Sequence, residues 1–136
     1  EKEFLKLVSK IKVHRPTLSR IFTIDHPVFL RLSNLLSKKT LVPLYVDYNL
    51  DSFEDFELKM TDFVNNLISY NKDSIVILPL RAIHFLISHF TKIPLEHARK
   101  MQIDFNGLSL LDSSGFNETG MSYIKFLNDT NHLKFP

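Results

Sequence analysis

Apolar residues along the chain alternate between the spacing of helices and the spacing of strands. Apolar side chains three or four residues apart predict amphipathic helices over about residues 3–12, 27–37, 52–70 and 80–90. Short apolar or β-branched runs predict strands over 20–24, 41–46 and 75–78. The third run is apolar at every position, which is typical of a strand buried in a parallel sheet.

The last third of the chain has a different pattern. Pro94 predicts the start of a short helix, because proline is favoured at the first helical position. Residues 107–111 and 121–127 alternate like paired strands, and the segment between them is rich in turn residues. Strands that alternate with helices favour an α/β fold, a three-layer sandwich with a mostly parallel sheet. We expect one domain over residues 1–136.

Polar residues follow each predicted strand of the parallel sheet. The strands are followed by Asp25 and His26, by Asp47 and Tyr48, and by Arg81 just beyond 75–78. Ligands of such sheets bind outside the carboxyl ends of the strands. These ends are therefore the places where we expect chemistry.

Composition removes several classes of function. The chain has no cysteine, so it forms no disulfide and no thiolate site. Its three glycines all lie in the last third, so no strand-to-helix turn contains the glycine that a phosphate-binding loop usually needs. No apolar run approaches the roughly 20 residues of a membrane span, and no signal peptide begins the sequence. We expect an intracellular protein.

Charged and metal-ligating residues give weaker indications. Lys2, Lys6 and Lys10 recur at helical spacing and suit contact with nucleic acid, although a solvated helix face explains them better without interleaved aromatic residues. The histidines of the helix over 80–90 and of the next segment lack the i, i+4 spacing of a helical metal pair. We therefore predict no metal and no cofactor.

Four short motifs resemble the histidine phosphatase (phosphoglycerate mutase-like) superfamily. They are P-L-E-H-A-R at 94–99, N-G-L-S-L at 106–110, L-N-D-T-N-H-L at 127–133 and R-I-F-T at 20–23. They occur in the order and at the separations of that family, and together they cover nearly the whole chain. The resemblance implies a histidine-phosphatase-like domain that is incomplete, because the family's first strand, with its R-H-G motif, has no counterpart in this sequence.

The resemblance also implies a phosphoryl-transfer site, but the sequence departs from it. In the family a histidine of R-H-G takes the phosphoryl group, while arginines and a second histidine neutralise its oxygens. Counting from neighbouring motifs places Val28 at the arginine of S-x-L-x-R and Pro79 at the histidine of S-H-G-G. These departures predict a non-catalytic protein, a pseudo-enzyme that serves as a structural or protein-interaction subunit of a larger complex.

Two further expectations follow from the resemblance. The alternative function is a ligand-sensing or weakly active domain that binds a phosphorylated small molecule through His26, Arg81 and His132. Without the family's first strand, the strand over 75–78 would have an unpaired apolar edge. We expect a strand of the same polypeptide or of a protein partner to cover this edge.

Overall fold

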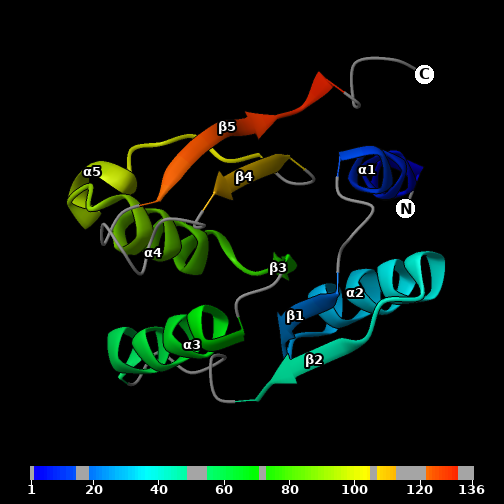
Figure 1. The fold of residues 1–136 in the computed structure, drawn as a ribbon, viewed down its shortest axis with the longest axis horizontal. Coiled ribbons are helices and arrows are strands. Elements are labelled where there is room, and N and C mark those ends of the chain that lie inside the picture. The colour runs from blue at the N-terminus through cyan, green and yellow to red at the C-terminus, as the bar shows by residue number, and fades with distance from the viewer. Residues whose placement is uncertain are drawn as a thin grey trace. The chain divides into compact units, whose positions relative to one another are not determined.

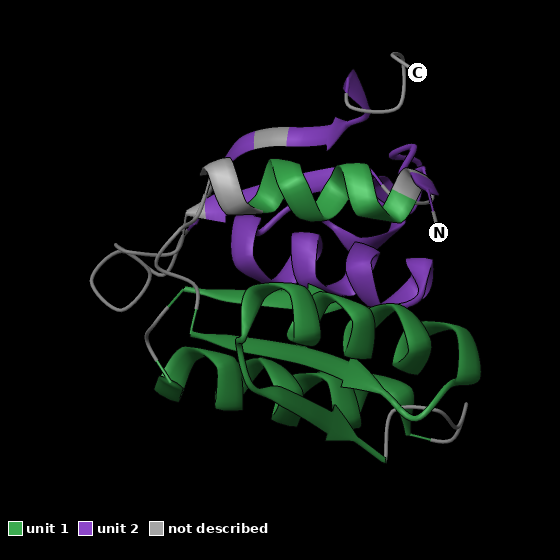
Figure 2. Cartoon of the chain, turned by 90° about the vertical axis from the view of Figure 1, so that its right-hand side faces the viewer, with its two compact units in different colours: residues 1, 3–78 green, residues 2, 79–136 purple. Residues whose placement is uncertain are grey.

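The computed structural model describes residues 2–14, 19–48, 55–70, 73–104, 107–112 and 122–131 (Figure 1). They fall into two compact units, the first made of residues 1 and 3–78 and the second of residues 2 and 79–136 (Figure 2). Each unit is described by itself, and the prediction of a single domain stays a prediction. Within the described residues, no helix is both long enough and apolar enough to cross a bilayer.

The first unit is built around a parallel sheet. Its elements are α1 (Lys2–His14), β1 (Arg20–Ile24), α2 (Pro27–Thr40), β2 (Leu44–Asp47), α3 (Phe56–Tyr70) and β3 (Ser74–Ile77). The strand order is β2-β1-β3, and both strand pairs are parallel. Phe22 in the central strand lies between Tyr45 of β2 and Val76 of β3. The predicted α/β class with a parallel sheet is confirmed.

Helices cover both faces of this sheet (Figure 2). Ile21 and Thr23 on one face are completely buried, and α2 packs against their strand. Phe22 on the opposite face contacts Phe63 and Tyr70 of α3, with ring centroids 5.9 and 6.3 Å apart. Side chains of a strand alternate between the two faces of a sheet. One face of β1 therefore packs against α2 and the other against α3, which gives a helix–sheet–helix sandwich.

The end of α2 corrects one predicted boundary. The sequence predicts a strand over 41–46, but Leu41 has a left-handed backbone, with φ 59°, and its N–H donates to the Ser37 carbonyl at 2.8 Å. This geometry closes a helix instead of opening a strand. β2 therefore begins only at Leu44, and Leu41 remains 89% exposed.

The second unit combines helices with a hairpin-like pair of strands. Its elements are α4 (Leu80–Thr91), α5 (Leu95–Ala98), β4 (Leu108–Asp112) and β5 (Tyr123–Asp129), and the two strands pair antiparallel as predicted. The Ser122 N–H donates to the Phe90 carbonyl at 2.8 Å, which joins the start of β5 to the end of α4. Buried His84 hydrogen-bonds through Nε2 to the Met101 carbonyl at 2.9 Å. The two contacts join α4 to the start of β5 and to the segment after α5.

Candidate functional site

The carboxyl ends of β1 and β2 lie side by side. Ile24 is paired with Asp47, and the Asp25 N–H donates to the Asp47 carbonyl at 3.3 Å. His26 follows Asp25, Tyr48 follows Asp47, and the side chains of His26 and Tyr48 are exposed. We call Asp25, His26, Asp47 and Tyr48 the carboxyl edge.

His26 begins α2. Its Nδ1 accepts a hydrogen bond from the Val28 N–H at 3.2 Å, and its ring lies 4.9 Å from the ring of Phe29. A neutral imidazole that accepts through Nδ1 carries its proton on Nε2. His26 therefore caps a helix with one nitrogen and keeps an N–H donor on the other.

The two positions predicted to have lost catalytic residues also lie at helix starts. Val28 is in the first turn of α2 and is 48% exposed. Pro79 is the N-cap of α4, with an extended backbone and no side-chain capping bond. Pro79 leaves no donor unpaired there, because proline has no backbone N–H.

The starts of α2 and α4 favour negative charge. Neither helix has an acidic residue in its first turn, whereas α3 has Glu57 in its own. A helix N-terminus carries partial positive charge and binds anions through its N–H groups. Each of the two helices follows a strand of the parallel sheet within three residues, which is where such sheets bind ligands.

The predicted ligand residues are distributed over both units. His26 belongs to the first unit, whereas Arg81 is half-buried in the first turn of α4 in the second. His132 lies outside the described residues. The lysines predicted to contact nucleic acid lie on α1, where Lys2 is exposed and Lys6 and Lys10 are half-buried, and that contact stays a prediction.

Sequence reasoning missed a hollow beside the carboxyl edge. It measures about 320 Å³ and is lined by Phe22, Tyr45, Val46, Asp47, Tyr48, Phe63 and Asn66. The run L-Y-V-D-Y at 44–48 indicates part of the lining, because residues two apart in a strand, such as Tyr45 and Asp47, lie on the same face. The contribution of α3 could not be read from that run.

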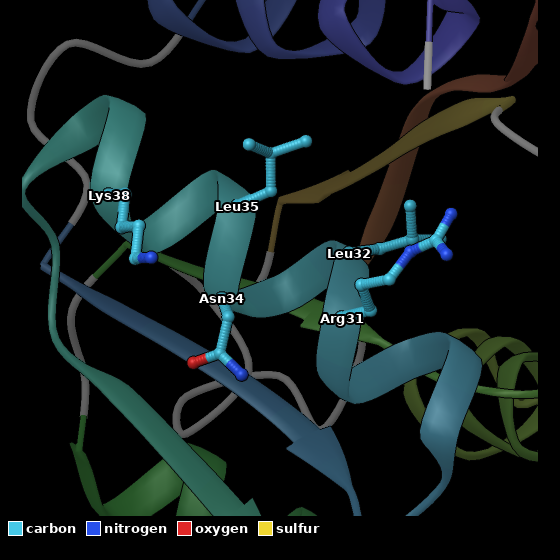
Figure 3. A pocket seen from close by; sticks show the side chains of 5 residues that line it. All are labelled: Arg31, Leu32, Asn34, Leu35 and Lys38. Atoms are coloured by element: carbon cyan, nitrogen blue, oxygen red, sulfur yellow. The ribbon is translucent and has the colours of Figure 1, made fainter.

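A second hollow, of about 260 Å³, lies along α2. Its lining residues Arg31, Leu32, Asn34, Leu35 and Lys38 all come from this helix, as Figure 3 shows. None of them is a residue that the sequence predicted for a site. In the described part of the chain, no three carboxylate or imidazole side chains are close enough together to hold a metal ion.

A polar cluster in the second unit has a structural role. Asn128 accepts from the Asp104 N–H through Oδ1 at 2.8 Å and donates to Asp104 Oδ2 through Nδ2 at 3.0 Å. Gln102 donates to Asp104 Oδ1, and the hydrogen bonds from Gln102 and then Asn128 lower the pKa of the Asp104 carboxyl. The Asn128 N–H donates to Ser109 Oγ at 2.9 Å. We call Gln102, Asp104, Gly107, Ser109 and Asn128 the Asp104 cluster.

Gly107 is required where it stands in this cluster. A Cβ at this position would lie 2.4 Å from Asn128 Oδ1 and 3.0 Å from the Asp104 carbonyl oxygen. No side chain fits at such separations unless Asn128 moves. The missing side chain of Gly107 therefore leaves room for Asn128, whose hydrogen bonds to Asp104 hold β5 in place.

Comparison with known proteins identifies the fold. No family model and no curated protein matches the sequence. A structure from Escherichia coli, proposed to be an α-ribazole-5′-phosphate phosphatase, matches with a TM-score of 0.76 and 11% identity, over 95% of this chain and 81% of that chain. The α-ribazole phosphatase of Shigella flexneri matches with a TM-score of 0.74 and 12% identity, over 95% and 81%.

A third similar structure contains a ligand. It is a mutant phosphoserine phosphatase from Entamoeba histolytica in complex with phosphoserine, with a TM-score of 0.67 and 14% identity, over 97% of this chain and 83% of that chain. The similarity to all three structures thus spans almost the whole chain.

These structures correct the prediction of a non-catalytic protein. The similar structures are described as phosphatases and match over at least 95% of the chain, and this finding contradicts the prediction. It depended on the lack of an R-H-G motif in the sequence and on counting residues from motifs to Val28 and Pro79. At 11 to 14% identity such counts do not align positions, because one inserted loop residue displaces them. The chain has the fold of these three structures.

Proposed function

We propose that the protein is a phosphatase-like enzyme that binds a phosphorylated small molecule at the carboxyl ends of β1 and β3. The observation that carries this proposal is the start of α2, where exposed His26 and a first turn without acidic residues follow the central strand directly. The phosphatases of the same fold support it.

The proposed roles follow from the chemistry of each group. The Nε2–H of His26 donates a hydrogen bond to a phosphate oxygen, while Nδ1 keeps the imidazole oriented through the Val28 N–H. Arg81 supplies positive charge in the first turn of α4. The first N–H groups of both helices add partial positive charge. Each of these groups can stabilise the charge that develops on phosphoryl oxygens during transfer.

The direct test is release of inorganic phosphate by the purified protein. Phosphoserine and α-ribazole-5′-phosphate, which occur in the descriptions of similar structures, are the first substrates to try. We expect His26→Asn, which retains a capping side chain, and Arg81→Gln each to lower kcat/KM by about 100-fold, the loss usual for one oxyanion donor.

The matched control is Arg99→Gln, which removes an exposed arginine after α5 and should leave kcat/KM unchanged. If the wild-type protein releases no phosphate and binds no inorganic phosphate at millimolar concentration, the proposed function is wrong. Hydrolysis that both substitutions leave intact would place the site elsewhere on the protein.

A second role, as a subunit of a larger assembly, is supported by β3. Among the described strands β3 pairs only with β1, and Ile75, Val76 and Ile77 are half-buried. An apolar edge strand is a ready template for a strand from another chain. We propose that a protein partner adds a strand there.

Affinity purification followed by stoichiometric mass spectrometry tests this role. Val76→Lys should abolish capture of the partner, because a charged residue on an edge strand opposes pairing. Leu58→Lys, at an exposed apolar position of α3, is the control that should retain it. Circular dichroism confirms that both variants fold. Recovery of the wild-type protein alone would contradict the role.

A further inference from the structure

The hollow beside β2 is formed by three elements of the first unit that are far apart in sequence. β1 contributes Phe22, the end of β2 and the residue after it contribute Tyr45, Asp47 and Tyr48, and α3 contributes Phe63. Its volume of about 320 Å³ is at the lower end of the range for ligand sites and suits a small group.

Aromatic rings form most of this hollow. The ring of Phe22 is held between Tyr45, at 5.8 Å and tilted by 31°, and Phe63, at 5.9 Å and nearly perpendicular. Tyr45 and Tyr48 are 43% and 67% exposed, so their rings remain accessible from solvent. The faces of aromatic rings carry partial negative charge, which attracts cations.

The same aromatic wall already holds one cation. The Cζ atom of Arg20 lies 3.4 Å from the ring centroid of Tyr70 and 4.6 Å from that of Tyr45. Arg20 is the first residue of β1, whereas the hollow lies toward the carboxyl end of the sheet. Tyr45 therefore contacts the guanidinium of Arg20 and also lines the hollow.

The polar lining of the hollow also favours a cation. Asp47 contributes a carboxylate and Asn66 an amide, and none of the seven lining residues is basic. Asp47 would repel a phosphate or a nucleic acid. A small, strongly hydrated metal ion would gain little from rings, whereas a weakly hydrated ammonium group gains from both the rings and the carboxylate.

We propose that this hollow binds an organic ammonium group, of the methylated or quaternary kind, between the rings of Tyr45, Tyr48 and Phe63 and beside the carboxylate of Asp47. The hollow adjoins the carboxyl edge through Asp47 and Tyr48, but the proposal does not depend on the proposed function. The hollow would recognise either a free small molecule or the ammonium group of a larger ligand.

The test compares two probes of the same shape, one of them charged. Choline and 3,3-dimethylbutan-1-ol differ in that a quaternary nitrogen replaces a quaternary carbon. Titration of the isotope-labelled protein by NMR should show choline perturbing the amides of Tyr45, Asp47 and Asn66. The uncharged alcohol should bind at least about tenfold more weakly, because it lacks the cation–π and ionic attraction.

Variants separate this site from weak binding to the surface. Tyr48→Ala and Asp47→Asn should each weaken choline binding by about two- to thirtyfold, the range for one cation–π or charge contact. Tyr48 is mostly exposed, so its truncation should leave the fold intact. Asp62→Asn removes an exposed carboxylate of α3 that does not line the hollow, and it should leave the affinity unchanged.

Three results would overturn the proposal. Equal binding of the two probes would show that the hollow recognises shape and not charge. Choline binding that Tyr48→Ala and Asp47→Asn do not weaken would place the contact elsewhere. Absence of any choline-dependent shift at millimolar concentration would show that the hollow binds no ammonium group. The probes contain no phosphate, so all three results are independent of phosphatase activity.

Discussion

The carboxyl edge and the Asp104 cluster use similar residues for different purposes. In the Asp104 cluster, two hydrogen bonds join Asp104 to Asn128, 24 residues away, and a third joins Asn128 to Ser109, 19 residues away. At the carboxyl edge, the bond that His26 makes is local, to the Val28 N–H two residues on. A polar group bonded to a distant segment stabilises the fold, whereas a group that makes only a local capping bond remains available to a ligand.

The largest expected effect comes from breaking the Asp104 cluster at Gly107. Gly107→Ala brings a methyl group to within 2.4 Å of Asn128 Oδ1, so the bonds between Asn128 and Asp104 must break or shift. We expect the free energy of unfolding to fall by about 2 kcal/mol, within the range for a substitution that breaks a hydrogen-bond network. Urea denaturation measures this change.

A double-mutant cycle shows whether the clash is the cause. Asn128 has φ 52°, which glycine adopts without strain, so Asn128→Gly removes the side chain at small backbone cost. In that background Gly107→Ala should lose less than half as much stability as it does alone. Equal losses in both backgrounds would contradict the account of Gly107.

An intermediate effect is expected at the carboxyl edge. His26→Ala removes the N-cap of α2 and should lower the free energy of unfolding by about 1 kcal/mol. His26→Asn should recover most of that loss, because asparagine caps helices well. Thermal unfolding of the two variants distinguishes them. If asparagine is no better than alanine, the hydrogen bond to Val28 does not stabilise the helix.

The smallest effect concerns acid stability. The folded state lowers the pKa of Asp104 below its ordinary value of 3.8, through hydrogen bonds from Gln102 and Asn128. A lowered carboxyl pKa contributes stability above the unfolded value, and the contribution disappears as the pH falls from about 3.8 through the folded value. Above that window it is constant.

Asp104→Asn isolates this contribution. Between neutral pH and about pH 3, the variant should lose slightly less stability than the wild type, as urea denaturation at several pH values can measure. Asp62→Asn, which alters an exposed carboxylate outside the cluster, serves as the control. A pH dependence that is the same in the Asp104 variant and the wild type would show that the cluster does not favour the ionised form.

Helices and strands could be predicted from the sequence wherever the pattern of neighbouring residues determines them. The strand at Arg20–Ile24 has the predicted boundaries, since its short β-branched run allows little else. Leu41 was assigned to the wrong element, because its left-handed backbone depends on how α2 closes and not on its own strand propensity.

The site could be predicted only in part. The positions after the strands identified the carboxyl edge, because parallel strands end together. The hollow beside β2 escaped prediction because Phe22 and Phe63 are 41 residues apart in the sequence, and only folding brings their rings to 5.9 Å. The assignment of Val28 and Pro79 to lost catalytic positions stays a prediction, since distance along the chain does not fix position in space.

One measurement tests the central claim most directly, namely mapping of inorganic phosphate on the isotope-labelled protein by NMR. The account predicts shifts concentrated at the amides of Val28 and Phe29 in α2 and of Arg81 in α4. It predicts no shifts at Asp104 and Asn128. Shifts in the Asp104 cluster, or none at the starts of α2 and α4, would contradict the account.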